Sequence, residues 1–144
     1  MTGVARWNDL APRLISAVVM LGVGGAALAL GGFWLRALLA LVCGAMIWEV
    51  ICLFAPQEGK RALGFAVATA MAFFGATWLP VSGAAFVMLA AVILIYKRLP
   101  VKGLLFPTYS ALVSAGAMGV SGLYTQSGLT PVIWLISLVI ITDL

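Results

Sequence analysis

Long apolar runs separated by short polar segments make up almost the whole chain. Six runs are predicted to be helices, over residues 14–35, 37–54, 62–79, 84–96, 104–123 and 131–144. The runs are continuous rather than alternating and are rich in Leu and Ala, which favours membrane-spanning helices over the strands of a membrane barrel. The pattern therefore predicts an all-α, polytopic transmembrane helical bundle with five complete spans and a truncated sixth.

Glycine, proline and capping residues mark the expected ends of two of these helices. Gly31 and Gly32 predict a tight turn near the far end of the first run. Asp9 is expected to cap a short interfacial turn before the first span. Thr130 and Pro131 have the residue types of an N-cap and a first helical residue, so the sixth span is expected to begin at Pro131.

Composition strengthens the membrane interpretation. The chain is 65% hydrophobic and 8% charged, whereas soluble domains are nearer half apolar and a quarter charged. The first apolar run is longer than the core of a signal peptide, so it is interpreted as a retained span. The sequence has no His, which excludes Ser-His catalysis and His metal sites from this chain.

The basic residues lie in clusters between the apolar runs, so the net charge of +4 is not interpreted as a nucleic-acid signal. Alternating spans place seven of the eight on one side of the membrane: Arg6, Arg13, Lys60, Arg61, Lys97, Arg98 and Lys102. Arg36 alone falls on the other side. Because basic loops stay in the cytoplasm, this asymmetry predicts a cytoplasmic N-terminus.

Two carboxylates, Glu49 and Asp143, interrupt apolar runs. A charge at bilayer depth costs about 3 kcal/mol on insertion scales, so each requires an explanation. Glu49 is near the cytoplasmic end of its span, where Arg13 or Arg61 could be an ion-pair partner, and a direct chemical role is the alternative. Asp143 lies past the middle of its span, which predicts a metal, a cation or a water-filled cavity, with a structural salt bridge as the alternative.

Small side chains recur at helix-packing spacing in the fifth span. Ser110 and Ser114 are four residues apart, as are Ala111 and Ala115. Such faces let helix backbones approach closely, so packing within the bundle is expected and a ligand groove is the alternative.

Three motifs occur in an order and spacing that carry a resemblance to a known family. They are "PRLISAVVM" at the start of the first span, "WEV" in the second and "ITDL" at the end of the last. Together they resemble the N-terminal portion of a bacterial phosphatidate cytidylyltransferase, also called CDP-diacylglycerol synthase, over nearly the whole chain.

The resemblance implies a multi-pass enzyme of the bacterial inner membrane that condenses CTP with phosphatidic acid, giving CDP-diacylglycerol and pyrophosphate. It implies Mg²⁺ as cofactor and a site open to the cytoplasm, and it makes Asp143 a metal-site or site-lining carboxylate. Arg13, Ser16 and Glu49 match family positions without an assigned reaction role, so the catalytic residues are unknown. The expected partners are the two substrates and the lipid bilayer, and a homodimer is left open.

The chain departs from the family because the C-terminal signature, a Ser-Lys-Arg-Lys-Asp-Gly-rich stretch, is absent. Residues 1–144 are therefore expected to be the N-terminal transmembrane portion of a longer enzyme, lacking the catalytic C-terminal half and inactive alone. Two other classes remain open. A transporter or channel subunit would use Asp143 and Glu49 as a cation or proton relay, and a structural membrane subunit would hold both carboxylates in ion pairs.

Overall fold

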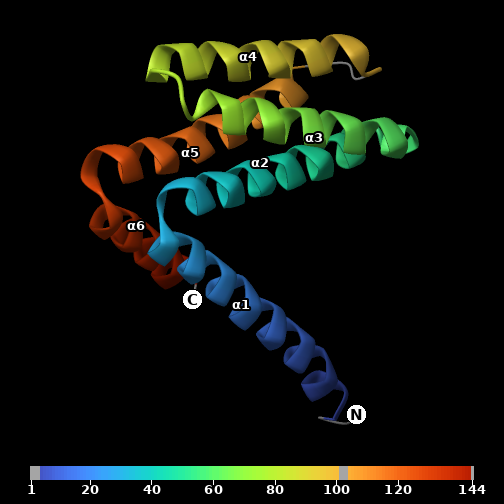
Figure 1. Cartoon of the computed structure of the whole chain (residues 1–144). Helices are drawn as coiled ribbons and strands as arrows, with labels where there is room; N and C mark the ends of the chain where they lie inside the picture. The colour runs from blue at the N-terminus through green and yellow to red at the C-terminus, as the bar shows by residue number, and fades with distance from the viewer. Residues whose placement is uncertain (1–3, 101–103, 144) are drawn as a thin grey trace. The chain divides into compact units, whose positions relative to one another are not determined.

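The computed structural model describes residues 4–100 and 104–143, without the side chains of residues 4–14, 16, 17, 139, 140 and 143. The described residues form six α-helices and one short 3-10 helix (Figure 1). These are α1 (Val4–Leu30), α2 (Gly32–Phe54), η1 (Pro56–Glu58), α3 (Gly59–Ala76), α4 (Val81–Arg98), α5 (Leu105–Ser127) and α6 (Leu129–Asp143). The all-α prediction is confirmed. The chain divides into two compact units, residues 1–35 and 36–144.

The first unit consists of α1 and the turn that follows it. Gly31 and Gly32 have φ angles of 63° and 45°, a left-handed conformation that residues with a Cβ rarely adopt. The amide of Gly31 donates to the carbonyl of Ala27 at 2.9 Å. The predicted turn is thus confirmed, but it ends the first helix at Leu30 rather than at residue 35.

The start of the first helix was predicted too late. The helix begins at Val4 rather than near residue 14, and its backbone includes Asp9 and Pro12 instead of an interfacial turn before them. An apolar run marks the part of a helix that suits hydrocarbon, whereas helical hydrogen bonding also continues through polar residues. The last helix likewise begins at Leu129, two residues before the expected Pro131.

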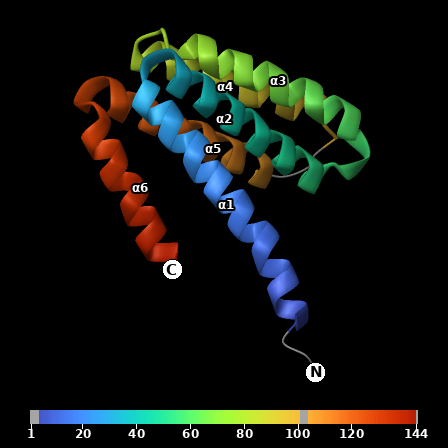
Figure 2. The same ribbon diagram turned by 60° about the horizontal axis from the view of Figure 1, so that its bottom comes forward.

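The second unit has its core between α2, α3, α4 and α5, which run in alternating directions (Figures 1 and 2). The pairs α3–α4, α4–α5 and α5–α6 are in contact. One buried cluster draws on all four helices and contains Ile47, Ile51, Ala62, Ile95, Leu99 and Phe106. A second cluster, from α2, α3 and α4, contains Ala40, Cys43, Phe73 and Met88. These apolar contacts fix the α2–α5 bundle.

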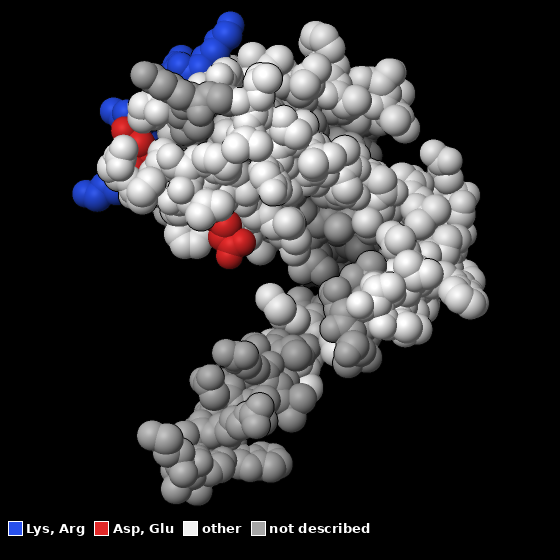
Figure 3. Space-filling model, turned by 180° about the vertical axis from the view of Figure 1, so that it is seen from behind, with Lys and Arg blue, Asp and Glu red and all other residues white. Residues whose placement is uncertain are grey.

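The two ends of this bundle differ in charge. Where α2 and α4 end and α3 begins lie four exposed cations, Lys60, Arg61, Lys97 and Arg98, which we call the basic end. Figure 3 shows these basic side chains gathered at one edge of the molecule. At the opposite end, the guanidinium carbon of Arg36 lies 4.5 Å from the ring centroid of Trp78, a cation–π contact that joins the start of α2 to the chain after α3.

Two of the described helices, α2 and α4, are long and apolar enough to cross a membrane, and only 28% and 22% of their apolar windows are buried inside the protein. Shorter apolar stretches cover Val18–Leu30 and Leu129–Leu138. The five complete spans predicted from the sequence are therefore met only in part. The sequence explains the shortfall in α3 and α5, because both are rich in Gly, Ala, Ser and Thr and α3 opens on two cations.

Candidate functional site

Asp143 is the fifteenth and last residue of α6. At 1.5 Å per residue, its backbone lies about 21 Å along the helix axis from that of Leu129. No other residue of α6 is charged, and the helix packs against α5, with Val132 fully buried. The side chain of Asp143 lies outside the described residues. The backbone therefore places the predicted site residue at the far end of a helix that offers no other ionisable group.

Glu49 lies on α2 five residues before the helix ends, about 7.5 Å from Phe54 along the axis. Its side chain is exposed. Arg61, one of its two predicted partners, forms an ion pair with Glu58 at 3.2 Å. The structure therefore does not bring Glu49 and Arg61 together. The other predicted partner, Arg13, lies in α1 with its side chain outside the described residues, as does the side chain of Ser16.

The described side chains include no group of three or more His, Cys, Asp or Glu residues that could hold a metal ion. Oxygen-ligand cations are held by several such groups together. The described residues alone do not fit a Mg²⁺ site, so any such site in this chain would depend on Asp143 and on ligands beyond the described residues.

The structure also contains a polar contact inside the bundle that the sequence patterns did not reveal. The thiol of Cys43, which is fully buried on α2, is hydrogen-bonded with the hydroxyl of Ser114 on α5. Ser114 in turn donates to the carbonyl of Ser110 at 2.8 Å. The Ser110 hydroxyl is buried and has no hydrogen-bond partner among the described residues. The spacing of Ser110 and Ser114 signalled a packed face, but nothing in the sequence linked that face to Cys43.

The small-residue face of α5 has both of its expected uses. Ser110 and Ser114 are buried in the bundle, which confirms the packing interpretation. Ala111, Ser114 and Ala115 also line a cavity of about 150 Å³ whose other wall is Met88, Val92 and their neighbours on α4. This cavity is almost entirely apolar, so it offers no group for acid–base or metal chemistry.

A comparison of the chain with protein-family models, curated proteins and solved structures finds no match.

Proposed function

We propose that this chain is a polytopic membrane protein whose N-terminus and basic end face the cytoplasm. The support is the charge distribution around the bundle. Among the described residues, four cations lie at the basic end, whereas Arg36 lies at the other end. Membrane proteins retain basic loops in the cytoplasm. In this proposal α3, α5 and α6 cross the bilayer together with α2 and α4, with their small side chains turned to helix packing.

Cysteine labelling tests this topology. In a background with Cys43 and Cys52 replaced by Ala, Lys60→Cys is expected to react only with reagents applied from the cytosol. Ser82→Cys is expected to react only with external reagents, because it lies at the opposite end of the bundle, at the start of α4. Both positions are exposed, so access does not depend on unfolding. Labelling of both from the same side, or from the reversed sides, would contradict the topology.

Within that membrane frame, we propose that the chain belongs to a nucleotidyltransferase of the bacterial inner membrane, which condenses CTP with phosphatidic acid in phospholipid synthesis. The observation that carries this proposal is the position of Asp143, a single carboxylate at the far end of an otherwise uncharged apolar helix. The support beside it is the order of the motifs "PRLISAVVM", "WEV" and "ITDL" along the chain.

The chemistry of that reaction explains why a carboxylate at this depth would be retained. A phosphate oxygen of phosphatidic acid attacks the α-phosphorus of CTP, and the bond from that phosphorus to the oxygen shared with the β-phosphate breaks, releasing pyrophosphate. Both partners are anionic, so alignment and electrostatic stabilisation dominate the barrier. Asp143 begins α6's approach to the cytoplasmic face, where the lipid phosphate lies, and the nearby cations of the basic end attract anionic lipid and nucleotide.

Mg²⁺ is part of this proposal through Asp143 alone, because the described residues do not supply the further ligands. When bound, such an ion neutralises phosphate charge. The contribution of this chain's own residues is to place one carboxylate at the end of α6 and to keep cations at the basic end.

The proposal is tested by incubating membranes that carry the complete protein with radiolabelled CTP and phosphatidic acid. Label is expected to enter the lipid fraction above the level of membranes lacking the protein. A transporter or channel would instead give cation or proton flux in vesicles without lipid labelling. Flux without labelling would contradict the transferase proposal.

A further inference from the structure

An apolar groove runs along the outside of α2 and α3. It has a volume of about 270 Å³ and is lined by Leu41, Gly44, Ala45, Trp48, Leu63, Ala66, Val67 and Ala70. None of these eight residues is ionisable. Gly44 forms part of the floor, since a Cβ placed there would lie 2.9 Å from the Ala66 carbonyl oxygen. Leu41 and Leu63 on the walls are 66% and 60% exposed. The small residues thus form a narrow floor and the large ones form open walls.

One end of the groove is basic. Lys60 lies three residues before Leu63 and seven before Val67 on α3, so all three share one helix face. Its neighbour Arg61 is paired with Glu58 at 3.2 Å, whereas the exposed Lys60 continues the line of the groove. The basic side chains in Figure 3 lie at this edge of the molecule. The groove therefore combines an apolar channel with a cation at one end.

We propose that this groove binds a phospholipid with an anionic headgroup, with one acyl chain along the groove and the phosphate beside Lys60. The inference rests on the proposed membrane location but goes beyond the proposed reaction, since this lipid is not the substrate. The charge arrangement favours it, because long basic side chains at helix ends extend toward the headgroup level, where anionic phosphates lie.

A second copy of the chain fits this groove less well. A two-fold dimer in a membrane has its axis along the membrane normal, so the same surface of each copy meets at the same depth. An interface along this groove would place the Lys60 ammonium groups of both copies at one level, where like charges repel. A lipid phosphate instead neutralises Lys60.

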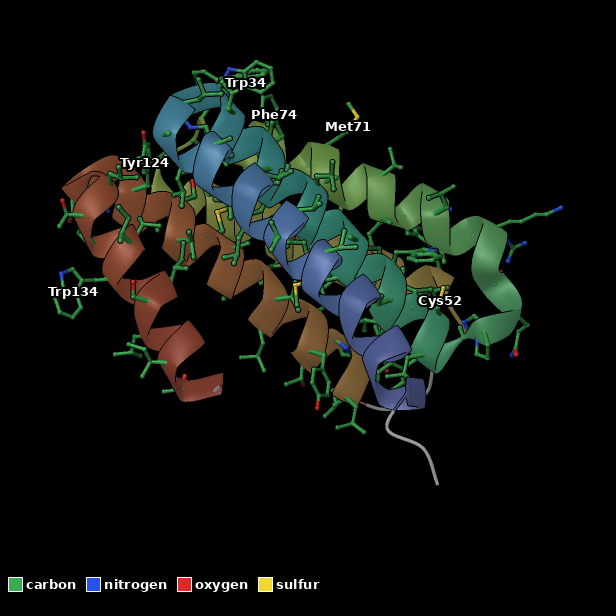
Figure 4. All side chains as sticks on the ribbon, turned by 90° about the horizontal axis from the view of Figure 1, so that it is seen from below. Trp34, Cys52, Met71, Phe74, Tyr124 and Trp134 are labelled. Carbon is green, nitrogen blue, oxygen red and sulfur yellow. The ribbon has the colours of Figure 1, made fainter. Side chains whose placement is uncertain are left out.

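Trp48 lines the groove and supplies the readout. The chain has five Trp residues, so a variant with Trp7, Trp34, Trp78 and Trp134 replaced by Phe reports on the groove alone. A matched variant that retains only Trp134 reports on bulk lipid. Trp134 is 72% exposed, and Figure 4 shows it pointing away from the neighbouring helices. Both variants of the complete protein are placed in bilayers containing lipids with brominated acyl chains, which quench tryptophan at short range.

Brominated phosphatidylglycerol is expected to half-quench Trp48 at about a fivefold lower mole fraction than brominated phosphatidylcholine, the preference that one basic residue provides at a membrane surface. Trp134 is expected to respond equally to both lipids. Lys60→Gln should abolish the preference, whereas Lys97→Gln, which removes a cation of the basic end from α4, should retain it. Ala45→Leu should fill the groove and weaken quenching of Trp48, whereas Leu at the exposed Ala68, which does not line the groove, should not.

Equal responses of Trp48 to the two lipids would overturn the site, and so would equal effects of Lys60→Gln and Lys97→Gln. Quenching of Trp134 without quenching of Trp48 would show that protein covers the groove, which also overturns it. If neither tryptophan is quenched, the proposed membrane location fails, and the site fails with it. If the complete protein does not transfer CTP while the quenching pattern holds, the proposed reaction fails and the lipid site remains.

Discussion

Asp143→Asn is expected to lower CDP-lipid formation by the complete protein about 100-fold or more while leaving the protein folded. The substitution keeps the shape of the side chain and removes its negative charge. Removing one preorganised polar group from a reaction site costs about 10²–10³-fold in rate, and α6 has no second charged residue to compensate. The measurement is the initial rate of CTP-dependent lipid labelling at equal amounts of membrane-inserted protein.

Ser137→Ala provides the matched control for Asp143→Asn. Ser137 is an exposed polar residue on the same helix, and its loss is expected to change the rate less than about twofold if α6 acts only through Asp143. Equal thermal stability of the two variants would show that α6 still packs on α5. A rate within a few-fold of the parent protein for Asp143→Asn would remove Asp143 from the site.

Gly44→Ala is expected to destabilise the bundle by about 1–3 kcal/mol, the usual cost of overpacking a tight contact. A Cβ at Gly44 would lie 2.9 Å from both the Ala66 carbonyl oxygen and the Ala70 Cβ. Neither obstacle is the movable end of a long side chain, so α2 and α3 would have to separate. The measurement is the free energy of unfolding of the purified protein in a denaturing detergent titration.

Gly64→Ala is the control, since it makes the same chemical change on the neighbouring helix. Nothing lies within 4 Å of a Cβ at Gly64. This variant is expected to be neutral or more stable by up to about 1 kcal/mol, because Ala favours the helix over Gly. Equal stability of the two variants would mean that α2 and α3 do not pack at Gly44 as described.

The hydrophobic pattern predicted the helices of this chain better than their membrane character. It located six helices and the turn at Gly31 and Gly32, because apolar runs and left-handed glycines are local signals. It placed the start of α1 ten residues late, because helical backbone is not limited to apolar residues. It also counted α3 and α5 as full spans, although their small side chains leave their hydropathy too low for that conclusion from composition alone.

The candidate site was predictable only where it depends on position along one helix. The isolation of Asp143 at the end of α6 follows from the sequence, and the helix bounds agree with it. The partner of Glu49 did not follow, because Arg61 is engaged by Glu58 on its own side of the turn. The contact between Cys43 and Ser114 joins residues 71 positions apart, and neither a motif nor a helical period specifies such a pair.

The most direct measurement of the proposed reaction follows two phosphorus labels. The purified complete protein is given phosphatidic acid with CTP labelled at either the α- or the γ-phosphate. Attack at the α-phosphorus predicts that the α-label enters the lipid in equal amount to the γ-label released as pyrophosphate. Release of the γ-label without lipid labelling, or transfer of the γ-label to lipid, would contradict nucleotidyl transfer as the function of this protein.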